Sequence, residues 1–130
     1  ARALILLESQ GLIKLDPDAG LKATAKDITE NPRKIVVKEI EAAQLPRSLS
    51  DVDMAVINGN YALQADLNPT KDALALEKEN SPMETFANIL AVRREDKDSK
   101  KLKALVEALK SEEVKKFMKD KYQGAVVPVD

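Results

Sequence analysis

The sequence predicts an α/β fold, and three observations support this prediction. Over residues 1–92, segments of helical character alternate with short apolar runs that have the length and β-branched content of strands. Turn residues such as Asn, Gly and Pro separate these segments. The 130 residues are 44% hydrophobic and 33% charged, a composition that buries one ordinary core. Alternation of helix and strand is the pattern of an α/β sheet.

Composition also limits the chemistry of the chain. The net charge is −1 with acids and bases interspersed, so no broad basic surface for nucleic acid is present. The chain has no His and no Cys, which removes the imidazole and thiol nucleophiles and the usual zinc ligands. No run approaches the roughly 18 apolar residues that span a bilayer. We expect no catalytic residue, no metal site and no cofactor.

The first segments predict a buried helix followed by short elements. Residues 1–9 read as helix, apolar nearly all round at positions 4–7, which is typical of burial between other elements. This helix has no preceding cap, and we expect the chain to be a fragment whose upstream strand is missing. Gly11 ends the helix, and residues 12–15 form a short extended piece. Thr24 caps a short helix over residues 25–30.

The middle of the chain supplies most of the predicted strands. Residues 35–41 are the clearest one, apolar first and then alternating, and residues 42–49 hold a short helix. Residues 54–57 form a second, buried strand. Weaker strand patterns cover residues 73–77 and 87–92.

The last part of the chain predicts two amphipathic helices after the charged segment 93–101. The first helix has one apolar face, and the second begins at Ser111 and ends at Gly124. The apolar residues of the two helices are Leu102, Leu105, Val106, Leu109, Val114, Phe117, Met118 and Tyr122. We expect Phe117, Met118 and Tyr122 to lie in the core.

A polar residue follows the buried strand at residues 54–57. Asn58 begins the turn Asn58-Gly59-Asn60, and a helix starts at about Tyr61. Ligands of open α/β sheets bind at the carboxyl ends of strands, and the Asn58 amide offers an acceptor and two donors, enough for a small zwitterion. Taken alone, Asn58 before Gly59 is more often just a turn residue. These residues by themselves indicate an α/β domain with a polar site.

Several stretches resemble a known family. They are Ala1-Arg2-Ala3-Leu4, Gly11-Leu12-Ile13-Lys14-Leu15, Glu41-Ala42-Ala43-Gln44-Leu45-Pro46-Arg47-Ser48-Leu49, Ala55-Val56-Ile57-Asn58-Gly59-Asn60-Tyr61-Ala62, Asn88-Ile89-Leu90-Ala91-Val92-Arg93 and Gly124-Ala125-Val126-Val127. They run the whole length of the chain, which is similar to the C-terminal half of the NlpA/MetQ-type methionine-binding lipoproteins, the substrate-binding proteins of ABC importers.

The resemblance implies a periplasmic-binding-protein-like fold of type II, a Venus flytrap whose lobe has a mixed sheet flanked by helices. Residues 1–84 would form the second lobe, residues 85–98 the crossing strand and linker between lobes, and residues 99–130 helices that return toward the first lobe. One departure is visible: about three extra residues, Met83 to Thr85, lie between Ser81-Pro82 and Asn88.

The resemblance also implies the ligand-binding residues. Arg2 matches the arginine that pairs with the ligand carboxylate, and Asn58 and Asn88 match asparagines that bond its amino or carboxylate group. Asn60 and Tyr61 are further candidates, with Tyr61 read as core packing first and as pocket edge second. From its position alone, Arg2 reads as a solvent-facing residue. Physical chemistry agrees for Arg2, because a guanidinium adds bidentate donors to a helix end that already favours anions.

The implied function is to bind an amino acid and to deliver it to the permease and ATPase subunits of an ABC transporter. The leading candidate for this amino acid is L- or D-methionine. A lipid anchor on the missing N-terminus would place the protein at the cell surface or in the periplasm. Three alternatives stay open: a structural or adhesive surface lipoprotein, a binding protein for a small dipeptide or another apolar amino acid, and an enzyme whose catalytic residue lies in the missing half.

Overall fold

The computed structural model describes residues 1–77, 86–122 and 124–128. Its elements are α1 (Arg2–Ser9), β1 (Lys14–Leu15), η1 (Gly20–Lys22), η2 (Ala25–Asp27), β2 (Ile28–Glu30), η3 (Ala42–Asp51), α2 (Gly59–Gln64), α3 (Pro69–Asp72), η5 (Arg94–Asp96), α4 (Lys100–Leu109) and α5 (Glu112–Tyr122). Here α marks α-helices, β strands and η 3₁₀-helices. The mixture of helices with a small sheet agrees with the predicted α/β class.

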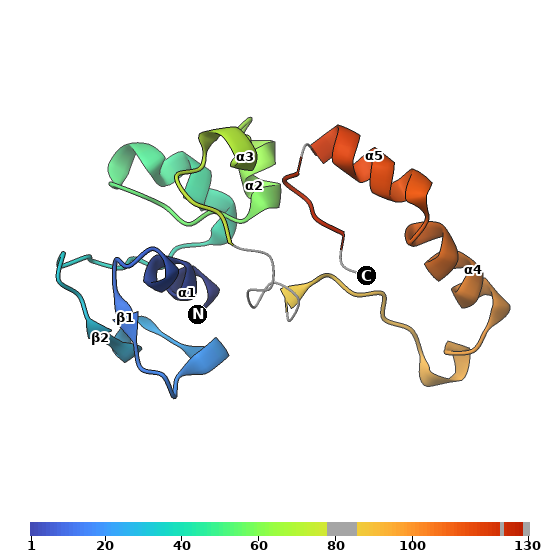
Figure 1. The fold of residues 1–130 in the computed structure, drawn as a ribbon, viewed down its shortest axis with the longest axis horizontal. Coiled ribbons are helices and arrows are strands. Elements are labelled where there is room, and N and C mark those ends of the chain that lie inside the picture. Colours follow the sequence, from blue (N-terminus) through green and yellow to red (C-terminus); the bar gives the residue numbers. More distant parts are fainter. Residues whose placement is uncertain (78–85, 123, 129–130) are drawn as a thin grey trace.

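The core lies between α1 and the hairpin of β1 and β2 (Figure 1). Its buried residues are Leu4, Ile13, Leu15 and Ala23, and Ile13 is only 2% exposed. The two strands pair antiparallel, with Leu15 opposite Ile28. Ala1 caps α1 without a side-chain hydrogen bond, and Gly11 leaves the helix at φ 69°, a conformation that favours glycine. The predicted helix and its stop are confirmed.

A capping box fixes the short helix η2. The Thr24 side chain accepts a hydrogen bond from Lys26 N, and Asp27 Oδ2 accepts from Thr24 N at 2.7 Å and from Thr24 Oγ1 at 2.8 Å. These hydrogen bonds lower the pKa of the Asp27 carboxyl. The predicted Thr24 cap is confirmed. The helix, however, ends at Asp27, and residues 28–30 are β2 instead of helix, because Ile28 pairs with Leu15.

Four segments predicted as strands are not strands in the structure: residues 35–41, 54–57, 73–77 and 87–92. Among the described residues the sheet has two antiparallel strands, so the predicted mixed sheet is not present there. A strand exists only where its N–H and C=O groups pair with a neighbour, and an apolar run does not specify that neighbour. Two of these runs each contain a largely exposed apolar residue, Val36 at 78% and Ile89 at 84%.

A second group of elements consists of η3, α2 and α3, drawn in green in Figure 1. Helix α2 contacts both η3 and α3, and its Ala62 is buried. The segment after α5 returns to this group: a Cβ on Gly59 would lie 3.1 Å from the Ala125 carbonyl oxygen, and one on Gly124 would lie 3.2 Å from Thr70 Cγ2. Residues 124–127 therefore pack closely against α2 and α3.

Helices α4 and α5 lie on the other side of the molecule (Figure 1). Ser99 caps α4 by accepting from Leu102 N at 3.2 Å, and Ser111 accepts from Val114 N at 3.3 Å, which confirms the predicted start of α5. The expected core position of Phe117 is wrong, because its residue is 56% exposed and Lys121 Nζ lies 5.6 Å from its ring centroid. Met118 and Tyr122 are half-buried.

Two predictions touch residues outside the described ranges. The lobe boundary at residues 84 and 85 and the extra residues Met83 to Thr85 both fall there. Within the described ranges, no helix combines the length and the apolar character needed to cross a membrane.

Candidate functional site

Arg2 is the first residue of α1, and its side chain is held by a carboxylate far along the chain. Arg2 Nε donates to Glu77 Oε1 at 2.7 Å and to Oε2 at 2.9 Å, and Arg2 Nη2 donates to Oε2 at 2.5 Å. The Arg2 side chain is 37% exposed and that of Glu77 is 20% exposed. The pair is therefore bidentate and partly buried, the geometry in which an arginine ion pair is strongest.

An aromatic ring lies over the same guanidinium. Arg2 Cζ is 5.7 Å from the centroid of the Phe86 ring, within the range of a cation–π contact. The hydrogen bonds to Glu77 raise the pKa of Arg2, partial burial opposes this rise, and the charge of Glu77 adds to it. Arg2 is thus a fixed positive charge at the amino end of α1, where the helix dipole also favours anions.

Asn58 caps α2 through its backbone and not through its side chain. The Asn58 carbonyl accepts from the N–H groups of Tyr61 and Ala62 at 3.0 Å each, and the residue has an extended backbone. Its side chain makes no capping hydrogen bond and the residue is exposed. Asn60 is exposed on α2, and Tyr61 is half-buried there. The Asn58 amide is therefore open to a ligand.

Asn88 lies two residues after Phe86 in an extended segment, drawn in yellow in Figure 1. The sequence predicts a strand over residues 87–92, but Asn88 is exposed and outside the sheet. The contact between Phe86 and Arg2 brings this segment to the start of α1. Within the described ranges, no hydrogen bond joins the side chains of Arg2, Asn58 and Asn88. Their convergence on one ligand stays a prediction.

Sequence reasoning missed Glu77. The residue ends the apolar pattern of residues 73–77, which the sequence predicts as a weak strand, and it is separated from Arg2 by 75 positions. An acid at the end of an apolar run was the available signal, because the polar residues of an α/β site lie at such ends. Its partner could not be found from the pattern alone.

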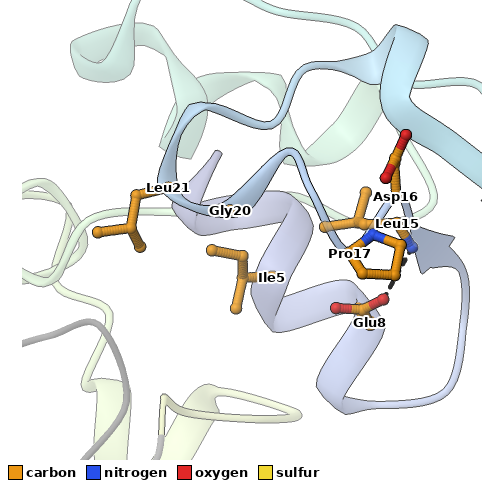
Figure 2. A pocket seen from close by; sticks show the side chains of 7 residues that line it. All are labelled: Ile5, Glu8, Leu15, Asp16, Pro17, Gly20 and Leu21. Carbon is orange, nitrogen blue, oxygen red and sulfur yellow. Dashed lines mark hydrogen bonds between the residues drawn. The ribbon is translucent and has the colours of Figure 1, made fainter.

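A pocket of about 420 Å³ lies beside α1, and none of the candidate residues is part of its lining. Figure 2 shows its lining, which consists of Ile5, Glu8, Leu15, Asp16, Pro17, Gly20 and Leu21. Both acids are already hydrogen-bonded: Glu8 Oε1 accepts from Leu15 N at 2.8 Å, and Asp16 Oδ1 accepts from Asp18 N at 2.9 Å. The lining has two carboxylates and no cation, so it repels a ligand carboxylate and does not fit the predicted site.

The part of the chain that the structure describes contains no cluster of three or more His, Cys, Asp or Glu residues that could hold a metal ion. The functional groups that the candidate residues Arg2, Asn58 and Asn88 carry are a guanidinium and two carboxamides.

The fold is shared with periplasmic substrate-binding proteins. A nutrient-binding protein from Burkholderia cenocepacia bound to methionine matches with a TM-score of 0.86 and 55% identity, covering 97% of this chain and 52% of that one. A periplasmic substrate-binding protein of an ABC transporter from Coxiella burnetii matches with a TM-score of 0.87 and 46% identity, covering 98% of this chain and 52% of that one.

The sequence profile of the family described as NlpA lipoprotein matches residues 1–130, and the chain belongs to this family. Outer membrane lipoprotein 3 of Mannheimia haemolytica is 50% identical over 98% of this chain and 47% of its own length. The probable D-methionine-binding lipoprotein MetQ of Pasteurella multocida is 44% identical over 97% of this chain and 45% of its own length. The chain thus spans about half the length of the curated relatives it matches.

Proposed function

We propose that the whole protein carrying this chain is the substrate-binding component of an ABC importer. It binds an amino acid in a cleft between two lobes, and methionine is the leading candidate for this ligand. The observation behind this proposal is the oriented Arg2 guanidinium at the start of α1. A related structure with 55% identity to this chain is bound to methionine.

Each polar group of an amino acid then has a partner of the right kind. The guanidinium of Arg2 takes the carboxylate, and the exposed amides of Asn58 and Asn88 bond the ammonium or carboxylate group. Asn60 and Tyr61, next to Asn58 in α2, are further ligand-binding candidates. Complete pairing matters because each polar group left without a hydrogen bond in a closed cleft reduces the free energy of binding by about 1–3 kcal/mol.

The proposal includes the arrangement of lobes. Residues 1–84 form the second lobe, residues 85–98 cross between lobes, and residues 99–130 return toward the first lobe. Apolar side chains of the last two regions support this assignment because they are exposed: Ile89, Leu90, Val92, Leu105, Val106, Leu109 and Phe117. We propose that the first lobe covers these exposed side chains.

Partners and location follow from the same proposal. The loaded protein delivers its amino acid to the permease and ATPase subunits of the transporter. A lipid anchor holds it to the membrane, at the cell surface or in the periplasm. The names of the relatives, as lipoproteins and ABC transporter binding proteins, support this placement.

Isothermal titration calorimetry of the whole protein with L- and D-methionine tests the proposal. Arg2→Ala is expected to weaken binding by about 2–3 kcal/mol, about a hundredfold in Kd, because the ligand carboxylate loses a charged bidentate donor. Asn88→Ala is expected to weaken it less. Arg33→Ala, at an exposed turn, is the matched control and should leave Kd unchanged. Equal affinities for Arg2→Ala and wild type would contradict the proposal.

A second function is a structural or adhesive role at the cell surface. It is favoured by one observation: the relative with 50% identity is named only as an outer membrane lipoprotein. A protein with this role binds no amino acid in the same titration, and the Arg2→Ala variant then behaves as the wild type does.

A further inference from the structure

The Glu77 carboxylate occupies only one edge of the Arg2 guanidinium. A guanidinium has five N–H groups in a fixed planar fork. Glu77 accepts from Nε and from Nη2, that is, along the edge where these two nitrogens lie side by side. The two N–H groups of Nη1 and the second N–H of Nη2 have no hydrogen-bond partner among the described residues. The edge between Nη1 and Nη2 is therefore open to a second carboxylate.

Access to one face of the guanidinium is also restricted by an aromatic ring. The Phe86 ring lies over Arg2 with its centroid 5.7 Å from Cζ. With Glu77 on one edge and Phe86 on one face, an anion reaches Arg2 with good hydrogen-bond geometry along the remaining edge. Arg2 then presents two parallel N–H donors, which match the two oxygens of a carboxylate.

We propose that Glu77 is a positioning residue, which holds Arg2 by its Nε edge so that the opposite edge binds the carboxylate of the amino-acid ligand. This inference rests on the proposed function and adds a residue to its site. Glu77 does not touch the ligand. It acts by fixing the long Arg2 side chain in one conformation before the ligand arrives, which reduces the ordering cost of binding.

The Lys14–Glu30 ion pair provides a comparison for the Arg2–Glu77 pair. Lys14 Nζ lies 2.7 Å from Glu30 Oε1, but the two side chains are 65% and 58% exposed and a single hydrogen bond joins them. An exposed pair of this kind orients its members weakly. The Arg2–Glu77 pair has three hydrogen bonds and less exposure, so it can hold a side chain in place.

The test measures the affinities of the whole protein for L-methionine and for L-methioninol by calorimetry. L-Methioninol keeps the ammonium group and the side chain but has a hydroxymethyl group in place of the carboxylate. Glu77→Ala is expected to weaken L-methionine binding about tenfold and to leave L-methioninol binding unchanged. Glu77→Gln keeps one acceptor for Arg2 and should fall between wild type and Glu77→Ala. Glu30→Ala is the matched control and should change neither affinity.

The ratio of the two affinities separates positioning from folding. If Glu77 only stabilises the lobe, its removal weakens both ligands equally, and this result would overturn the inference. An unchanged ratio, or tighter L-methionine binding because Glu77 merely competes for Arg2, would also overturn it. Wild-type protein that binds neither ligand, or binding of L-methionine that is insensitive to Arg2→Ala, refutes the proposed function and this inference together. L-Methionine binding that depends on Arg2 but not on Glu77 refutes the inference alone.

Discussion

Both ends of the chain form helices that carry apolar side chains, but only the first end buries them in a core. In the first region, Leu4 of α1, Leu15 of β1 and Ile13 just before β1 are buried in a core. The helices α4 and α5 have no buried residue among their described positions, and Leu105, Leu109 and Phe117 are exposed. A pattern therefore determines which face of a helix is apolar, whereas burial depends on a partner surface. The first region has its partner in the β1–β2 hairpin.

The largest expected effect breaks the core of the first region. Ile13→Ala should lower the free energy of unfolding of the whole protein by about 3 kcal/mol, because it removes a side chain that is 2% exposed and leaves a cavity. Urea denaturation followed by circular dichroism measures this. Val36→Ala, at a residue that is 78% exposed, is the control and should cost under about 0.5 kcal/mol. Similar costs at the two positions would show that the described core is not the one that stabilises the protein.

A smaller effect sharpens the comparison at the other end. In the whole protein, Phe117→Ala is expected to lower the free energy of unfolding by about 2 kcal/mol, because we propose that the first lobe covers this ring. The exposed neighbour Lys116 provides the control, since Lys116→Ala should stay within about 0.5 kcal/mol. The same denaturation experiment applies. A cost for Phe117→Ala no larger than that of the control would mean that α5 keeps an uncovered face.

The smallest effect concerns pH and the cap of η2. Hydrogen bonds from Thr24 lower the pKa of Asp27 in the folded protein from the ordinary value of 3.8, so the ionised carboxylate stabilises the fold. This stabilisation is present above about pH 4 and is lost as the pH falls through the lower folded pKa. Wild type should exceed Asp27→Asn in Tm at neutral pH, and the difference should shrink in acid. A difference that is constant from pH 7 to pH 2 would contradict the role of Asp27; Asp18→Asn is the control.

Local signals in the sequence predicted local structure well. Thr24 caps η2 and Ser111 accepts from Val114 N at the start of α5, and Gly11 and Gly124 leave helices at positive φ of 69° and 87°. Each of these features depends on residues within one turn of the chain, through a side-chain oxygen near a free N–H or a backbone that only glycine adopts easily. These helix ends are therefore readable from the sequence without a structure.

The sequence did not predict which residues far apart along the chain pair with each other. The apolar runs at residues 35–41 and 54–57 predict strands, but nothing in them identifies the strand with which they would pair. Among candidate site residues, the sequence and its family resemblance point to Arg2, Asn58 and Asn88, whereas Glu77 became visible only through its contact with Arg2 across 75 positions. Phe86 joined the site in the same way.

By itself, the sequence determined the family, several helix caps and stops, and the lack of His and Cys side chains, because these depend on residue identity and on neighbours along the chain. Only the tertiary structure decided which apolar faces are covered and which edge of the Arg2 guanidinium is occupied. Burial and hydrogen bonding act between surfaces that meet in space, and one-dimensional spacing does not say which surfaces meet.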